Sequence, residues 1–332
     1  MNLMLTSAAY LFAALAVGVM GFAIQRGATC TVAAVDEAVT KRSFRRLASI
    51  VEASLWVLGG LLIAQSLHWL GTMPGGYAVG WVTVLGGALL GLGAYVNRAC
   101  VFGAIARLGS GEWAYVMTPV GFYVGCLSVG AVFSFAAPPL LPHASPVLEA
   151  SAWIALLFVL LLLGRIGQLL LAKRPGEPAP RWRERLAQRV WSPHAATTVI
   201  GITFFFSLLL AGAWAYTDVL AELARGMASN VFGRVLLLVA LFVGALIGGW
   251  TAGRFRSRRI SLPQLAKCFA GGVLMGWGSL LIPGGNDGLI LVGMPLLWPY
   301  AWIAFLSMCT AIALALIAEK ALGQYAPKPG VE

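Results

Sequence analysis

One pattern occurs twice in the chain, 185 positions apart. Residues 86–103 read GGALLGLGAYVNRACVFG, and residues 271–288 read GGVLMGWGSLLIPGGNDG. A gapless alignment pairs these glycines: Gly86/Gly271, Gly87/Gly272, Gly91/Gly276, Gly93/Gly278 and Gly103/Gly288. Each copy is an apolar stretch that ends in a polar break, at residues 97–100 in the first and 283–287 in the second. Interrupted apolar segments at matching places in two halves are typical of a binding site between membrane-embedded repeats.

The composition of the chain indicates that these apolar segments lie in a lipid bilayer. The chain is 60% hydrophobic and 11% charged, with a mean hydropathy of +0.86, whereas soluble domains carry about 25% charged residues. A bilayer span needs about 20 apolar residues. We therefore predict nine spans, at residues 4–24, 48–69, 79–96, 114–136, 151–172, 196–217, 231–253, 266–283 and 299–319. The first segment lacks a basic leading region, so we expect a retained span and not a cleaved signal peptide.

The distribution of basic residues predicts the orientation. Of 23 lysines and arginines, all but Arg225 and Arg234 fall in or beside segments that lie inside if the N-terminus is outside. This asymmetry follows the positive-inside rule and predicts an outside N-terminus and a cytoplasmic C-terminus. The net charge of +11 then matches the anionic inner leaflet, and we do not expect a nucleic-acid partner.

The span count also predicts how the halves are related. The two copies of the pattern lie five crossings apart, so they run in opposite directions and form an inverted repeat. We expect an N-terminal membrane repeat at 1–172, a basic cytoplasmic linker at 173–194 and a C-terminal membrane repeat at 195–332. The fold class is therefore an all-α polytopic membrane protein, an inverted-repeat helical bundle. The short apolar segments 99–106 and 288–297 are interpreted as re-entrant half-helices, or alternatively as interfacial amphipathic helices.

The polar breaks contain the residues that can carry chemistry. Cys30 and Cys100 each follow a span within a polar break, close in sequence to an arginine, and a nearby cation favours the reactive thiolate. The other cysteines (Cys126, Cys268 and Cys309) are interpreted mainly as buried small hydrophobes. No C-x-x-C spacing, metal-ligand cluster or nucleotide-binding loop occurs, so we expect no metal and no cofactor.

Asn97 and Arg98 interrupt the first copy, and Asn286 and Asp287 form the matching break in the second. An ionisable residue within a membrane segment indicates a functional site, although Arg98 equally fits an anchor that reaches the headgroups.

These residues resemble the YeeE/YedE family of bacterial inner-membrane proteins for sulfur-compound transport, which includes thiosulfate permeases. The resemblance rests on the two glycine blocks, the Arg-Ala-Cys at 98–100 and the run GFAIQRGATC at 21–30. It implies cysteines along a central path, with Cys30 and Cys100 matching two family cysteines. The family usually has Gly-Cys-Asn in the second half, so its third cysteine is absent at Gly285. The resemblance also implies a cytoplasmic sulfur-carrier protein as a partner.

Our main hypothesis is a permease for a small sulfur-containing anion, thiosulfate or a related compound, on a glycine-framed path. The expected path residues are Cys30, Cys100, Asn97, Arg98, Gly285, Asn286 and Asp287. The expected framing glycines are Gly91, Gly93, Gly103, Gly276, Gly278 and Gly288. The alternatives are a channel for another small solute, a membrane-bound enzyme that carries a persulfide on Cys100, and a structural membrane protein without a pathway.

Overall fold

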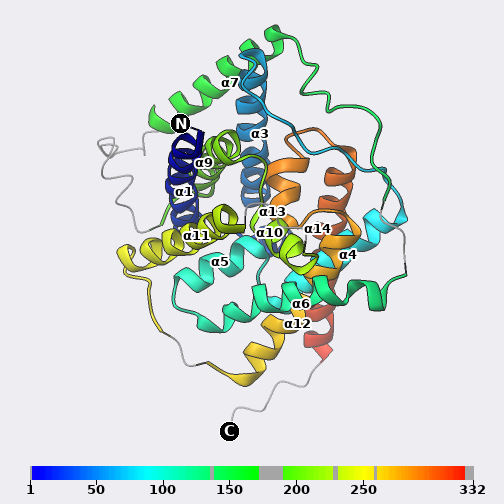
Figure 1. Cartoon of the computed structure of the whole chain (residues 1–332). Helices are drawn as coiled ribbons and strands as arrows, with labels where there is room; N and C mark the ends of the chain where they lie inside the picture. Colours follow the sequence, from blue (N-terminus) through cyan, green and yellow to red (C-terminus); the bar gives the residue numbers. More distant parts are fainter. Residues whose placement is uncertain (1, 135–137, 172–189, 227–230, 258–259, 326–332) are drawn as a thin grey trace.

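The computed structural model describes residues 2–134, 138–171, 190–226, 231–257 and 260–325 (Figure 1). Apart from an isolated β-bridge between Tyr77 and Leu140, the regular elements in these ranges are helical. The first half contains α1 (Asn2–Gly27), α2 (Thr31–Lys41), α3 (Arg45–Ser66), α4 (Trp81–Asn97), α5 (Val101–Gly109), η1 (Trp113–Val116), α6 (Met117–Val132) and α7 (Ala152–Leu171). The second half contains α9 (Pro193–Ala211), α10 (Tyr216–Ala224), α11 (Val231–Thr251), α12 (Leu262–Leu281), α13 (Asn286–Gly288), η2 (Leu289–Gly293) and α14 (Pro299–Tyr325). The predicted all-α polytopic fold is confirmed.

Each of the nine predicted spans coincides with a helix, but not every helix is a full span. Within the described residues, seven apolar helices or broken helices are long enough to cross a membrane, and the bent pair formed by α12 and residues 286–293 is an eighth. The ninth, α7, has an apolar part, Trp153–Gln168, that is shorter than the others. Sixteen residues rise only about 24 Å, less than the roughly 30 Å hydrocarbon core.

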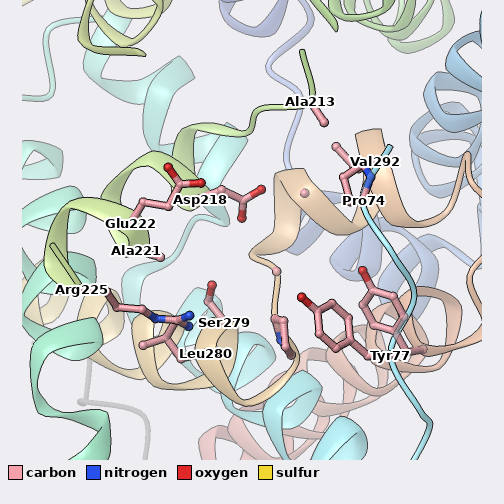
Figure 2. A pocket seen from close by; sticks show the side chains of 14 residues that line it. Pro74, Tyr77, Ala213, Asp218, Ala221, Glu222, Arg225, Ser279, Leu280 and Val292 are labelled. Carbon is pink, nitrogen blue, oxygen red and sulfur yellow. The ribbon is translucent and has the colours of Figure 1, made fainter. Parts of the chain in front are cut away.

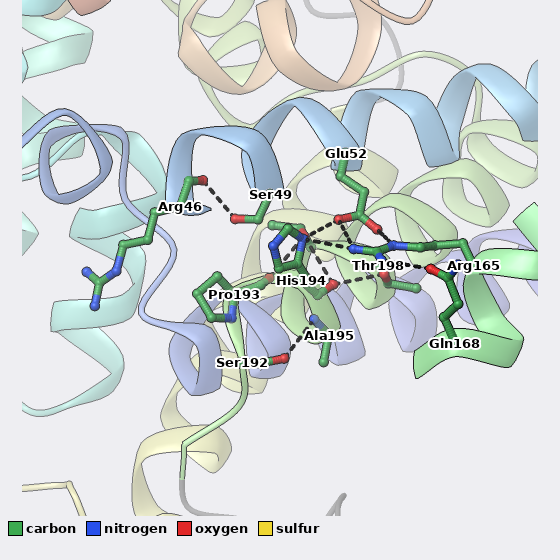
Figure 3. A network of polar contacts seen from close by, with 11 residues as sticks. Arg46, Ser49, Glu52, Arg165, Gln168, Ser192, Pro193, His194, Ala195 and Thr198 are labelled. Carbon is green, nitrogen blue, oxygen red and sulfur yellow. Dashed lines mark hydrogen bonds and ion pairs between the residues drawn. The ribbon is translucent and has the colours of Figure 1, made fainter. Parts of the chain in front are cut away.

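A polar network joins the helix α7 to α3 and α9 (Figure 3). Arg165 Nε on α7 donates to Glu52 Oε1 on α3 at 2.9 Å, and His194 at the start of α9 contacts the other oxygen of the same carboxylate. Arg165 Nη1 also donates to Gln168 Oε1 at 3.2 Å. One carboxylate therefore joins three helices. The expected linker, 173–194, lies outside the described residues from 173 to 189.

The second half repeats the element order of the first at the spacing of 185 found in the sequence. The short helix α2 begins at Thr31 and α10 begins at Tyr216, while α5 begins at Val101 and α13 begins at Asn286. The longer helices match in the same way: α1 with α9, α3 with α11, α4 with α12 and α6 with α14. Each half thus places two short helices directly after long ones.

Helices from the two halves cross each other through the repeated glycines. A Cβ atom on Gly86 would lie 2.9 Å from the Gly278 carbonyl oxygen, and one on Gly93 would lie 2.6 Å from the Gly271 carbonyl oxygen. Gly86 matches Gly271, and Gly93 matches Gly278, so each glycine meets the counterpart of the other. The residue number of the contacting position increases along α4 while that of its partner decreases along α12. The two helices are therefore antiparallel, as an inverted repeat requires.

The remaining contacts form two groups that each mix both halves. The helix α1 packs on α9 and α11, and α3 packs on α9; α12 packs on α4 and α6, and α4 packs on α14. Gly87 lies beside Ala304 and Gly91 beside Met308, which makes α4 and α14 parallel. This agrees with third and ninth crossings that run in the same direction. The two halves are thus interleaved in space.

Candidate functional site

Four short helices begin close together near the middle of the molecule, where Figure 1 places α5, α10 and α13. The helix α13 contacts α5 and α10, and α2 contacts α5. The residues that precede the four helices all have extended backbone: Cys30, Cys100, Ala215 and Gly285. The first N–H groups of a helix lack partners within it and carry partial positive charge. The junction therefore presents donors suited to an anion.

Three of the long helices that precede the short ones end with a shared C-terminal turn, which directs the chain toward this junction. Arg98 has a φ of 58°, and Ala99 N donates to Ala94 O at 3.1 Å. The same closing bond is formed from Thr29 N to Ile24 O, at 3.2 Å, and from Gly284 N to Ser279 O, at 2.9 Å. This left-handed ending with a six-to-one bond is a common helix C-terminus. It lets only three or four residues separate the long helix from the next short one.

The first half contributes a pair of free thiols, Cys30 and Cys100. Their side chains are hydrogen-bonded to each other, and Thr31 N donates to Cys100 Sγ at 3.1 Å. Cys100 is fully buried and Cys30 partly so. A Cβ atom on Gly103 would lie 2.5 Å from Cys30 Sγ, so this repeat glycine makes room for the thiol. The structure thus brings together the two cysteines that lie 70 residues apart in the sequence.

The second half contributes an amide and a carboxylate beside the thiols. Thr31 Oγ1 donates to Asn286 Oδ1 at 3.5 Å, which joins the two halves of the site. Asn286 is fully buried, and its Nδ2 finds no partner among the described residues. Asp287 is 3% exposed, and its carboxylate accepts from Thr217 N at 3.1 Å and from Thr217 Oγ1. A buried donor without a partner is costly, so Asn286 Nδ2 is the clearest open position for a ligand oxygen.

Gly285, the position of the missing family cysteine, is closed to a side chain. A Cβ atom there would overlap Thr217, and Thr217 is held by its bonds to Asp287. At Gly288 a Cβ atom would lie 3.2 Å from Asp218 Oδ2. The second half therefore replaces thiols with Thr217, Asp218 and Asp287.

The other two predicted polar residues, Asn97 and Arg98, are bonded to partners other than the thiols. Asn97 is buried and fully engaged, with Nδ2 donating to Ala99 O at 2.7 Å and Oδ1 accepting from Thr118 Oγ1 at 3.0 Å. Arg98 is exposed and pairs with Glu319 at 2.5 Å and 2.8 Å. Asn97 therefore supports the break, and Arg98 behaves as the surface anchor that the sequence allowed.

Four of the six framing glycines belong to helix crossings. Gly93 and Gly278 meet the backbone across α4 and α12, Gly91 meets α14, and Gly276 meets α6. Only Gly103 and Gly288 lie beside side chains of the short helices, at Cys30 and Asp218 respectively.

Sequence reasoning missed Thr31, Thr217 and Asp218. The repeat spacing could have located Thr217 and Asp218. Ala215 lies 185 positions after Cys30, so the residues that follow it should begin the short helix that matches α2. The search for glycine pairs and cysteines did not reach it, because neither residue type stands at Ala215.

A cavity of about 280 Å³ adjoins the second-half residues (Figure 2). It is lined in part by Tyr77, Asp218, Arg225, Gly284 and Tyr300. The segments around it, residues 67–80, 212–226 and 282–298, belong to the side that the charge distribution predicts as outside. The thiols lie toward the other side, at the breaks that follow α1 and α4.

Comparison with known proteins agrees with this arrangement. Residues 26–314 match the family described as sulphur transport. The thiosulfate transporter TsuA of Escherichia coli (strain K12) is 24% identical over 329 residues, which cover 88% of this chain and 90% of TsuA. The match of the family spans both halves and all four short helices. The chain belongs to the sulphur transport family, the YeeE/YedE proteins.

Proposed function

We propose that this protein is a permease of the bacterial inner membrane that carries thiosulfate or a chemically similar small sulfur anion. Its N-terminus lies outside and its C-terminus in the cytoplasm, where a sulfur-carrier protein receives the product. The observation that carries the proposal is the buried junction of Cys30, Cys100 and Asn286. The family and the similarity to a thiosulfate transporter support it.

The junction suits an anion with one soft sulfur end and several oxygens. A thiol is a weak donor and a weak acceptor of hydrogen bonds, and the paired thiols offer a polarizable contact to a terminal sulfur. Asn286 Nδ2 offers a donor to an oxygen, and the helix starts of α2 and α5 add partial positive charge around the thiols. Sulfate presents only oxygens, so the thiols favour thiosulfate over sulfate.

The test is uptake of labelled thiosulfate by bacteria that lack other sulfur importers. We expect Cys100→Ser and Cys30→Ser to reduce uptake at least tenfold at equal expression. Cys126→Ser is the matched control, because Cys126 is buried on α6, where its thiol donates to the Gly276 carbonyl oxygen at 3.9 Å and not to the Cys30–Cys100 pair. We expect Asn286→Leu to reduce uptake as well, because the open donor is lost while the volume is kept.

Two results would overturn the proposal. Normal uptake by Cys100→Ser would remove the thiols from the path. Equal permeation of sulfate and thiosulfate through the native protein would indicate a channel for small solutes in general.

A further inference from the structure

The cavity beside α10 holds a carboxylate that the proposed thiol path does not use. Asp218 lines this cavity together with Glu222 of the same helix and Arg225, the residue that follows it. Figure 2 shows the Asp218 and Glu222 side chains on one wall and Tyr77 on the opposite wall. The cavity reaches Gly284, next to the closed position Gly285.

A second carboxylate, Asp287, lies on the other flank of Gly285. It is buried and held by Thr217, while Asp218 accepts a hydrogen bond from the Gly285 backbone. Asp218 also lies beside Gly288. Both carboxyl groups are therefore close to the short segment 284–286, which leads from the cavity to Asn286. An anion in the cavity therefore lies beside Asp218, with Asp287 on the other flank of Gly285.

The neighbouring groups do not neutralise these carboxylates. Glu222 is paired with Arg234 of α11, so these two charges offset each other. Arg225 is the cation that lines the cavity. The other titratable groups that face Asp218 are Tyr77 of the loop before α4, Tyr300 of α14 and Cys126 of α6. Phenols and thiols are neutral near pH 7, so when both carboxyl groups are ionised, their two charges exceed that of Arg225 and leave the surroundings of the cavity negative.

A negative passage repels an anion, most strongly where water is scarce. Burial and a like charge both favour the protonated form of a carboxyl group. Protonation of Asp218 would make the sum of charges around the cavity zero, and its neutral carboxyl could donate a hydrogen bond to an oxyanion.

The repeat shows that the carboxylates are specific to one end of the path. In the first half Ala33 stands 185 positions before Asp218, and Phe102 stands 185 positions before Asp287. At these matched positions of the four short helices, the thiols Cys30 and Cys100 therefore belong to the end predicted as inside, and the carboxylates Asp218 and Asp287 to the end predicted as outside. The two ends have different chemistry although their backbones match.

We propose that Asp218 binds a proton from the outside together with the anion, so that the protein is a proton–anion symporter. This inference rests on the proposed function and adds its driving force. Asp218 accepts the proton in the cavity, the anion passes the neutral carboxyl, and both leave on the inside. No covalent bond is formed or broken.

The experiment uses the full chain in proteoliposomes with labelled thiosulfate. An acidic outside should raise the initial uptake rate of the native protein at least fivefold over equal pH, with accumulation above the outside concentration. Unlabelled thiosulfate added to a weakly buffered medium should make that medium more alkaline. Asp218→Asn should lose both effects and keep only an exchange that does not respond to pH.

Two further variants separate the proposal from misfolding. Asp218→Glu should recover part of the response to the gradient. Asp36→Asn, at an exposed residue of α2, should behave as the native protein. The inference is overturned if native uptake ignores the pH gradient, or if Asp218→Asn still follows it. Exchange at equal pH tests the proposed function separately, because its absence would exclude thiosulfate as a substrate.

Discussion

The pair of Cys30 and Gly103 shows how narrowly single residues define the site. Cys30 ends one break and Gly103 lies in the first turn of α5, so the thiol occupies the space that a side chain at 103 would need. In the second half, Ala215 replaces Cys30, and Gly288, the counterpart of Gly103, faces Asp218 instead. Neither arrangement tolerates an added methyl group without movement of the side chain that carries the chemistry.

At this scale we predict that Gly103→Ala reduces thiosulfate uptake at least tenfold, because the new Cβ displaces Cys30 Sγ from Cys100. Overpacking of this kind costs about 1–3 kcal/mol, so the melting temperature in detergent should fall slightly. Uptake and thermal melting of the purified variant check both parts.

Gly130→Ala on α6 is the control, because nothing lies within 4 Å of a Cβ atom there. It should leave uptake unchanged and raise stability by up to about 1 kcal/mol, as expected for Gly→Ala in a helix. Native uptake by Gly103→Ala would contradict the tight fit of Cys30.

At the scale of helices, the crossing of α4 and α12 holds the two breaks in register. Its close approach depends on glycines that alternate between the two helices, with backbone against backbone at Gly86, Gly93, Gly271 and Gly278. In lipid, such packing replaces the hydrophobic effect as the source of helix association. The crossing therefore determines where Cys100 and Asn286 lie relative to each other.

We expect Gly278→Val to separate α4 from α12, because its Cβ would lie 2.5 Å from the Gly86 carbonyl oxygen and 2.7 Å from Leu90 N. The cost should exceed the roughly 1–3 kcal/mol of ordinary overpacking, because rigid backbone has to move. The melting temperature should fall by several degrees, and uptake should be lost.

Gly164→Val on α7 provides a comparison, since the Cβ position there has no neighbour within 4 Å. It should melt within about 2 °C of the native protein. A Gly278→Val variant as stable as Gly164→Val would contradict the close crossing.

At the scale of the whole molecule, the relative directions of the helices agree with nine alternating segments. Loops predicted on the same side also contact each other: Leu141 N donates to Gly76 O at 2.8 Å on one side, and Arg256 N donates to Ser110 O at 3.0 Å on the other. The alternation explains why Asp218 and the Cys30–Cys100 pair belong to ends of the molecule that face opposite sides.

We predict that Gly71→Cys reacts with a membrane-impermeant maleimide in intact cells, because residue 71 lies in an exposed loop on the side expected outside. Lys41→Cys should react only after permeabilisation. The native protein gives the background of its five cysteines. The reverse pattern would show that the basic loops do not lie inside.

The sequence was sufficient for the helical fold class, the spacing of 185 and the family, because apolar runs and glycine periods are local properties. Its pairing of Cys100 with position 285 also agrees with the structure, since Cys100 and Gly285 precede α5 and α13 in the same backbone conformation. The sequence could not separate Arg98 as a surface anchor from Arg98 as a path residue, because that depends on Glu319, 221 positions away.

Only the tertiary structure decided which groups meet. It placed Cys30 against Cys100, Thr31 against Asn286, and Asp287 against Thr217, although these partners are separated by up to 255 positions. It also showed that most repeat glycines serve helix crossings. The physical reason is that contacts in an interleaved inverted repeat join helices of opposite halves, and no local pattern encodes the depth at which two such helices cross.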